Sequence, residues 1–282
     1  MITNENLIRE LKRDVRDLES LRKVIAGRKN RLAADNIDWK LDNILGSTKE
    51  NGKSQPGLLT IKGRFERNIE KNLINWPIWT EWLMNIPGAG PRTIGALVLH
   101  YYYIFKPVCK ECGAPLELRV GSDNDKKSYI CTSCDTVSKG MLKHEIGFRD
   151  FPKISNWWTF AGRGDPDYKK RRKGMKLDEL NKGGLPRLKE NGYQIGESFI
   201  KQKNRYYTDF YLPRKEKRAR EYPNWSKGKI DGFAKNEMVK LFLAHFWSVA
   251  REIEGLPVTK PYAGTILGHT GMIEPFYWNG NG

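Results

Sequence analysis

Four cysteines carry the most specific chemical signal in this sequence, and they form one motif. Cys109 and Cys112 are separated by two residues, as are Cys131 and Cys134, and eighteen residues lie between the two pairs. Thiolates at this spacing wrap a metal ion in two tight turns and complete a tetrahedral shell of four sulfurs, which suits Zn2+. We therefore predict one structural zinc ion per chain. Two disulfides or an iron site are the alternatives.

The residues between the cysteine pairs fit a small β zinc ribbon. The segments PLELRV and KSYIC read as short strands, joined by the polar loop GSDNDKK. All four sulfurs are needed to close the shell, so no coordination position stays open for catalysis. A segment of this size is too small to build its own core, and the metal would stiffen it.

A second motif, MNIPGAGPRTIGALVL, places glycines between two apolar segments. Gly88 and Gly90 can take the positive φ angles of a tight turn, and Pro91 suits the first turn of a helix. The free amides of the new helix would then face a phosphate. This predicts a helix-hairpin-helix whose DNA-binding residues are Gly88, Ala89, Gly90, Arg92 and Thr93. An ordinary corner between packed helices is the alternative.

Charge indicates the class of partner. The chain has 50 Lys and Arg against 33 Asp and Glu, a net charge of +17. Neutralising phosphates releases condensed counterions, so we expect a DNA partner, duplex or branched, with RNA possible. Two clusters would contact it: Lys169, Lys170, Arg171, Arg172 and Lys173, then Arg214, Lys215, Lys217 and Arg218. A basic surface that is merely solvated is the alternative.

The elements that must position these motifs are mainly helical. Leucines and isoleucines at alternating steps of three and four from Leu7 to Leu32 predict a coiled-coil helix and a homodimer. Docking of that helix on its own chain is the alternative. We expect six segments: a dimerisation helix at 1–45, a linker at 46–64, the helix-hairpin-helix at 65–106, the zinc ribbon at 107–140, a basic domain at 141–257 and an irregular tail at 258–282.

Apolar faces indicate the core. Trp76, Trp79, Leu83 and Ile86 share one face before the glycine turn, and Ile94, Leu97 and Val98 follow it. The histidines His100, His144, His245 and His269 have no partner at metal spacing and read as structural. Hydrophobic residues make up 39% of the chain, and no uncharged apolar run approaches the roughly 20 residues of a membrane span. We expect a cytoplasmic, DNA-associated protein.

The order of coiled coil, hairpin and basic segment resembles the C-terminal half of the insertion-sequence one-ten transposases. These are RNA-guided recombinases that pair a RuvC-like DEDD domain with a serine-bearing domain. The likeness covers more than half of the chain and runs through the blocks LMNIPGAGPRTIGALVLHY, ISNWWTFAGRGDPDYKKRRKG, LNKGGLPRLKENGYQIGESF and AKNEMVKLFLAHFW.

Three departures from that family bear on activity. The DEDD domain precedes the coiled coil in the family, whereas this sequence starts at the coiled coil; the catalytic serine position aligns with Lys173; and the zinc ribbon is inserted. The resemblance therefore implies a non-catalytic, transposase-derived DNA-binding protein with no catalytic residue. An active recombinase or nuclease, with another nucleophile or a partner chain, is one alternative. An architectural protein coating the DNA of a virus or mobile element is the other.

Overall fold

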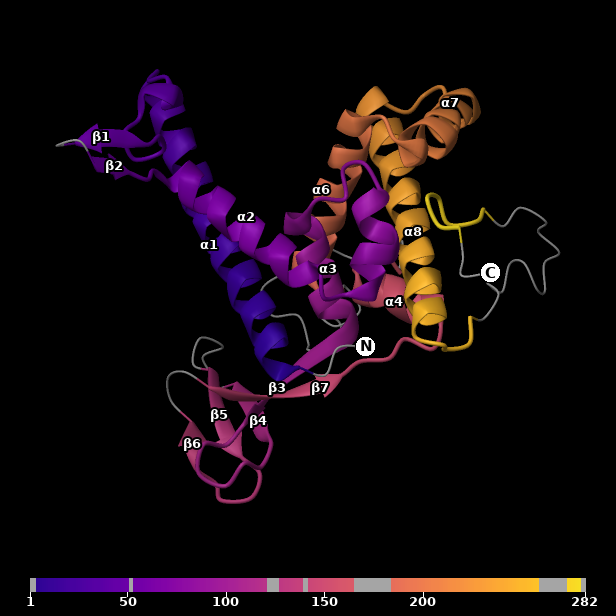
Figure 1. Ribbon diagram of the computed structural model, residues 1–282. Coiled ribbons are helices and arrows are strands. Elements are labelled where there is room, and N and C mark those ends of the chain that lie inside the picture. The colour runs from indigo at the N-terminus through magenta and orange to yellow at the C-terminus, as the bar shows by residue number, and fades with distance from the viewer. Residues whose placement is uncertain are drawn as a thin grey trace. The chain divides into compact units, whose positions relative to one another are not determined.

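The computed structural model describes residues 4–50, 53–120, 127–138, 142–164, 184–258 and 273–279. It is mainly helical, with small antiparallel sheets (Figure 1). The chain forms two compact units: Met1–Leu99 together with Phe151–Gly282, and His100–Asp150. No helix in the described part combines the length and the hydrophobicity that crossing a membrane requires.

Two long helices, α1 (Glu5–Ala34) and α2 (Leu58–Leu73), pack along each other in the first unit. The side chain of Asn4 begins α1 by accepting hydrogen bonds from the amides of Asn6 and Leu7. The seam of α1 is buried within this one chain at Leu11, Leu18, Ile25 and Leu32. The helix therefore docks on its own chain, and the homodimer through residues 1–45 stays a prediction.

The described residues of 46–64, the segment expected to be a linker, include strands and the start of a helix. This segment contains the antiparallel strands β1 (Thr48–Glu50) and β2 (Lys53–Gln55), and α2 begins at Leu58. A carboxylate organises this region: Asp42 accepts hydrogen bonds from the amides of Ile44 and Leu45 and forms an ion pair with Arg28 at 2.6 Å. The glycine and serine content of the segment predicts a linker. Composition does not reveal the contacts of Asp42, because they depend on Arg28 of α1.

The apolar face before the glycine turn is buried as predicted, but the helix is irregular. Trp76, Trp79, Leu83 and Ile86 are all buried. The regular helix α2 ends before Pro77, and the chain continues as a π-helical turn at Ile78–Trp82 and a 3-10 turn at Leu83–Asn85. Pro77 lacks an amide hydrogen and cannot continue the ladder of α2.

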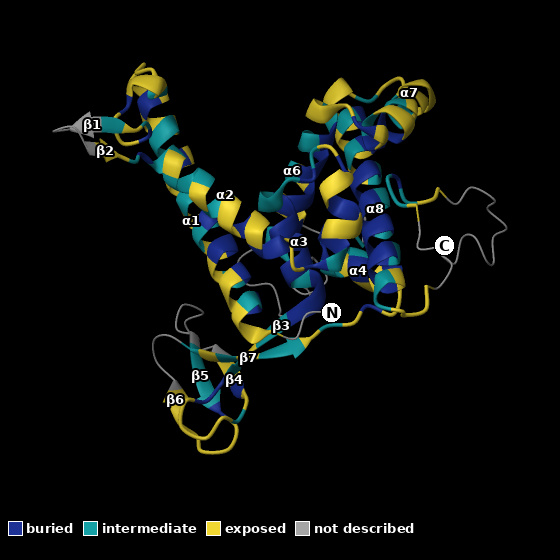
Figure 2. Cartoon of the chain, in the orientation of Figure 1, coloured by how far each residue is buried: buried dark blue, intermediate teal, exposed yellow. Residues whose placement is uncertain are grey.

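Helix α8 (Lys227–Ile253) lies in the core of the first unit, and its second half, from Met238 to Arg251, is mostly buried (Figure 2). The remaining elements of this unit are η1 (Trp39–Leu41), α3 (Pro91–Tyr102), α4 (Ile154–Phe160), α6 (Pro186–Gln202), η4 (Tyr206–Tyr211) and α7 (Leu212–Glu221). Rings fill the space between them. Phe242 of α8 stacks with Trp82 and meets the edges of Phe199 and Tyr206.

The C-terminal segment at 273–279, expected to be an irregular tail, anchors itself in this core. Phe276 is buried against the rings of Tyr206 and His245. Its carbonyl accepts a hydrogen bond of 2.8 Å from the indole of Trp82. These contacts make the tail part of the first unit.

The second unit consists of strands. A two-stranded ribbon pairs β3 (Tyr103–Val108) with β7 (Lys143–Phe148), from Tyr103 opposite Phe148 to Val108 opposite Lys143. Beyond it, β4 (Leu116–Val120), β5 (Lys127–Cys131) and β6 (Val137–Ser138) form an antiparallel sheet in that order. The two predicted strands are confirmed. The insert is longer than the expected 107–140, because the ribbon belongs to it.

His245 is a buried structural histidine. Its Nδ1 lies 3.0 Å from the hydroxyl of Tyr206, and its Nε2 lies 2.9 Å from the carbonyl oxygen of Ile273. Burial lowers the pKa of His245 to about 4, although the bond to Ile273 opposes this change. The imidazole is therefore neutral near pH 7. It donates from Nε2 and accepts at Nδ1.

This burial predicts a pH dependence of stability. Between pH 6.5 and about 4 the unfolded chain takes up a proton on His245 that the folded chain does not, so stability falls as the pH falls. The loss attributable to this group is on the order of 3 kcal/mol. Thermal unfolding at pH 7 and pH 4.5 should show a smaller drop for His245→Gln than for the wild type. His144→Gln, in the second unit, is the control, and equal drops in all three proteins would contradict the assignment.

Candidate metal centre and nucleic-acid interface

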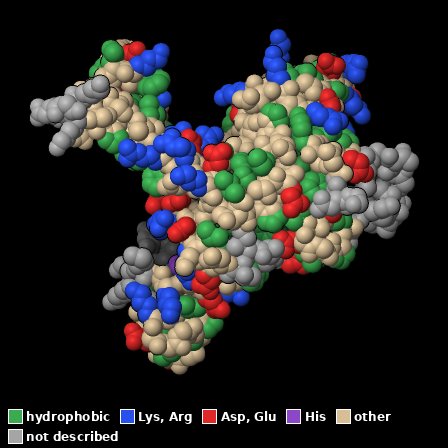
Figure 3. Space-filling model, viewed as in Figure 1, with side chains coloured by type: hydrophobic (Ala, Val, Ile, Leu, Met, Phe, Trp, Pro, Cys, Tyr) green, Lys and Arg blue, Asp and Glu red, His purple; other side chains and the backbone are tan. Residues whose placement is uncertain are grey.

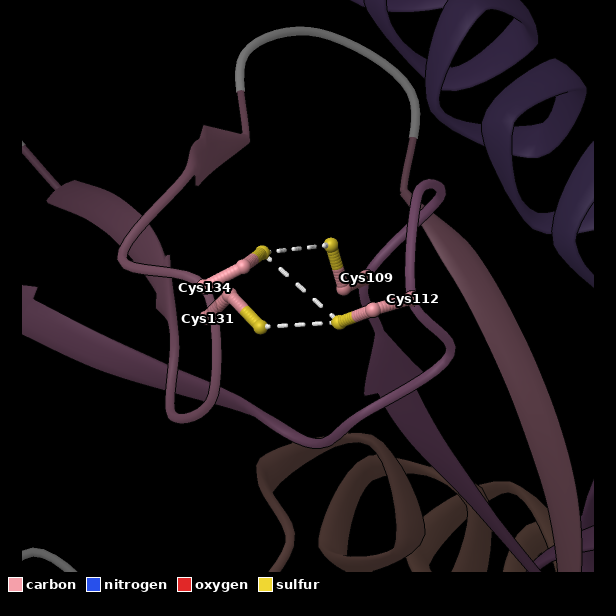
Figure 4. Close-up of side chains that lie close together, drawn as sticks. All are labelled: Cys109, Cys112, Cys131 and Cys134. Atoms are coloured by element: carbon pink, nitrogen blue, oxygen red, sulfur yellow. Dashed lines mark hydrogen bonds between the residues drawn. The ribbon is translucent and has the colours of Figure 1, made fainter.

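The four cysteines converge on one point of the second unit (Figure 4). Their sulfur atoms all lie within 4.8 Å of one another. Three separations are 3.7 Å (Cys109 to Cys134), 3.4 Å (Cys112 to Cys131) and 3.6 Å (Cys112 to Cys134). The cysteines are not joined as disulfides. This group could hold a metal ion.

The two cysteine turns are built alike. Gly113 directly follows the first pair and has φ +76°, and Asp135 directly follows the second pair and has φ +53°. The amide of Cys109 donates to Ala114 O at 2.8 Å, and the amide of Cys131 donates to Thr136 O at 3.0 Å. Each turn therefore uses one left-handed residue to bring its two sulfurs to the same side.

The thiols differ in acidity. Hydrogen bonds from the side chain and the backbone of Thr136 lower the pKa of Cys134 to about 6. For Cys112 a backbone hydrogen bond at Ala114 acts in the same direction, but its bonds to the other cysteines raise the pKa to about 12. Neighbouring thiols titrate together, so the first thiolate forms easily and the next one costs more. A metal cation would favour the thiolate at every position.

The glycine turn packs against α6. Gly88 has φ +91°, as predicted, and a Cβ atom there would meet Ser198 Oγ at 3.0 Å and Gln202 Cγ at 3.2 Å. The side-chain amide of Asn204 donates to Pro87 O at 2.7 Å. Gly88 therefore allows the turn to pack closely against α6.

The other hairpin residues divide between buried and accessible. Gly90 has no positive φ, contrary to expectation, and a Cβ atom there would meet nothing within 4 Å. Ala89 is buried, and so is Thr93, whose hydroxyl donates to Gly90 O at 3.1 Å. The side chain of Thr93 thus lies inside the fold, which removes it from the predicted contacts. Arg92 is partly exposed and remains a candidate with Gly90.

Two buried asparagines position the turn, and the sequence analysis missed both. Asn204 holds Pro87, and Asn191 of α6 donates to Thr93 O at 2.7 Å. Both asparagines are less than 7% exposed. Nothing in the sequence marks them, because their partners lie about a hundred residues away.

The second predicted cluster lies on α7, which has no buried residue. Its cations are mostly paired: Lys215 with Asp231, Lys217 with Glu221, and Arg218 with both Glu221 and Glu237. The guanidinium of Arg218 also stacks on Phe233. Arg214 forms no ion pair with a described acid. It is the member of this cluster with the most available charge.

The first predicted cluster, Lys169, Lys170, Arg171, Arg172 and Lys173, lies outside the described residues. On the face drawn in Figure 3, Lys and Arg side chains gather over α2 and near α7. On α2, Arg64 and Arg67 are exposed and form no ion pair with a described acid. These cations were not among the predicted contacts, because sequence runs reveal clusters only when the charges are adjacent.

Comparisons of the chain with protein-family models, with curated protein sequences and with solved structures found no match.

The two glycines of the turn should respond differently to substitution. Gly88→Ala forces a Cβ against Ser198 in a left-handed conformation and should lower the free energy of unfolding by about 1–2 kcal/mol. Gly90→Asn adds a side chain into open space at a position where asparagine caps a helix well, so stability should change by less than about 0.5 kcal/mol. Denaturant unfolding of both variants tests this difference. Equal losses would contradict the packing role of Gly88.

Proposed function

We propose that this chain is a non-catalytic, transposase-derived protein that binds the backbone of duplex or branched DNA. The observation that carries the proposal is the net charge of +17 together with cations that have no acidic partner among the described residues. Examples are Arg64, Arg67, Arg92 and Arg220. Such side chains keep their full charge for phosphates, and the release of counterions then drives binding.

The glycine turn supports the same proposal, but with fewer contact residues than the sequence predicts. Gly90 precedes α3, and its carbonyl accepts from the amides of Thr93 and Ile94. The space beside its Cα is open. A phosphate can therefore approach the start of α3 at Gly90 and Arg92, while Gly88 holds the turn on α6.

The transposase-derived part of the proposal is supported by the order of the sequence blocks. Lys173 aligns with the serine position of that family, and an amine at that position cannot replace a hydroxyl as the nucleophile of the serine chemistry. The proposal therefore assigns DNA holding and no DNA cleavage to this chain.

The proposal includes zinc at the four cysteines. Zn–S bonds of about 2.3 Å in a tetrahedron place the sulfurs about 3.8 Å apart. Three of the sulfur separations, at 3.4–3.7 Å, are close to that value. The donor set of four thiolates also suits zinc. The ion would have a structural role.

DNA binding is tested with two variants of Gly90 that differ only in charge. Gly90→Asp and Gly90→Asn have nearly the same shape and both cap a helix well, but the aspartate places a negative charge where a phosphate would lie. We expect Gly90→Asp to bind labelled duplex or four-way-junction DNA roughly tenfold more weakly than Gly90→Asn. Gel shifts at two salt concentrations measure this, and the affinity should fall with salt.

The same gel shifts, repeated with Mg2+ and with a structured RNA, give results that could overturn the proposal. Cuts that appear with Mg2+ would favour an active nuclease. Cooperative coating of any sequence would favour an architectural protein, and tighter binding of a structured RNA would replace DNA as the partner. Equal affinities of the two Gly90 variants would remove the turn from the interface.

Metal content tests the zinc assignment. Elemental analysis of the purified chain should find one zinc per chain. Cys134→Ser should lose it, because Cys134 is exposed and the substitution breaks the shell without a packing change. Ser133→Ala, in the same turn, is the control and should keep the metal. A chelator should increase hydrogen exchange within residues 100–150, and a metal-free chain with unchanged protection there would contradict a structural ion.

A further inference from the structure

A cavity of about 360 Å3 lies in the first unit among α1, α3 and α6. Its volume falls within the range of about 300–1,000 Å3 that is usual for ligand sites. Charged side chains make up much of its lining: the cations Arg22, Lys23, Arg92 and Arg187, and the acids Glu19 and Glu190. We call these four cations and the space between them the basic pocket.

The acids of the pocket neutralise only part of its positive charge. Glu19 forms an ion pair with Arg187. Glu190 accepts a hydrogen bond from the amide of Gln194, which in turn accepts one from Arg22 at 3.0 Å. Arg22, Lys23 and Arg92 form no ion pair with a described acid. The pocket is left with an excess of two positive charges.

Two of these cations repel each other. Arg92 is partly buried, and burial lowers its pKa first, followed by the charge of Arg22; Glu66 acts weakly in the other direction. Two partly buried guanidinium groups near each other are unfavourable without an anion to bind both. A phosphate oxygen pair matches the planar donor array of arginine and would compensate both charges.

The scaffold around the pocket is rigid. Asn191 lines the pocket and ties α6 to α3 through Thr93 O. A Cβ at Gly95 would lie 2.7 Å from Ile69 and 3.3 Å from Val15, so this glycine is what allows α1 and α2 to approach α3 closely. The helices that carry Arg92 and Arg187 are thus fixed relative to each other before a ligand arrives, which reduces the cost of organising the site.

We propose that the basic pocket binds one phosphate group through Arg22, Lys23 and Arg92, its cations that hold no described carboxylate. This inference rests on the proposed function: the phosphate belongs to the DNA backbone that passes the start of α3. Arg92 is the second residue of α3 and joins the pocket to the Gly90 turn. A free phosphate compound is the other source of the same chemistry.

The test uses a double variant and a control with the same charge. Arg22→Gln with Arg92→Gln removes two charges from the pocket. Lys106→Gln with Lys143→Gln removes two charges from β3 and β7 of the second unit, where both lysines are exposed. Each full-length protein is titrated with inorganic phosphate and with pyrophosphate at constant ionic strength, and thermal unfolding is followed. Duplex DNA affinity is then measured at several salt concentrations.

We expect pyrophosphate to raise the melting temperature of the wild type and of the lysine control, but not that of the arginine variant. The arginine variant should bind DNA roughly tenfold more weakly than the control. Its slope of log affinity against log salt should be shallower by about one. In buffer without phosphate its melting temperature should not fall below that of the wild type, because the repulsion between Arg22 and Arg92 is gone.

The outcomes separate this inference from the proposed function. If the wild type binds DNA but the arginine variant matches the lysine control in affinity and salt slope, the pocket inference is overturned and DNA binding stands. Suppose that none of the three proteins binds DNA, but pyrophosphate still stabilises the wild type and the lysine control and not the arginine variant. The pocket is then supported as a site for free phosphate, and the proposed function fails. If pyrophosphate stabilises all three proteins equally, the pocket inference is overturned.

Discussion

The burial of α3 on all sides constrains the rest of the first unit. Every residue from Thr93 to Leu99 is buried, so neighbours must cover the whole circumference of this helix. Gly95 admits α1 and α2 on one side, because a larger residue would collide with Ile69. On another side of α3, the side-chain amide of Asn191 from α6 donates a hydrogen bond to the carbonyl oxygen of Thr93. The start of α3, with its turn and its cations, is thereby held in a fixed position.

The large positive charge is managed in two ways. On α7 and α8, carboxylates neutralise cations: Asp231 contacts both Lys215 and Lys235, and Glu237 contacts Arg218. On α1, Arg9, Arg13, Arg16 and Arg28 hold carboxylates, whereas Arg22 of α1, Arg64 and Arg67 of α2 and Arg92 of α3 form no ion pair with a described acid. The length of a basic run is therefore a poor guide to binding. Cations that already hold a carboxylate must give up that contact to hold a phosphate.

Some of this structure could be read from the sequence, and the rest depends on contacts between distant segments. The cysteine spacing and the apolar faces around Ile86 and Leu97 are local patterns, and the structure brings those residues together or buries them as predicted. The difference between Gly88 and Gly90 is not local, since it depends on Ser198 of α6. Phe276 in the core and Arg187 beside Arg92 likewise result from chain paths that periodicity does not encode.

The second unit shows how a small cysteine-bearing module can be inserted into a helical protein. The ribbon pairs Tyr103 with Phe148, so the chain enters and leaves the module at one place. An insertion with adjacent ends leaves the surrounding fold continuous. The buried cluster of this module consists of Cys109, Leu116 and Cys131. Since two of these three residues belong to the cysteine group, the core of this unit and the group that could hold a metal ion are one structure, and a bound ion would stabilise the sheet directly.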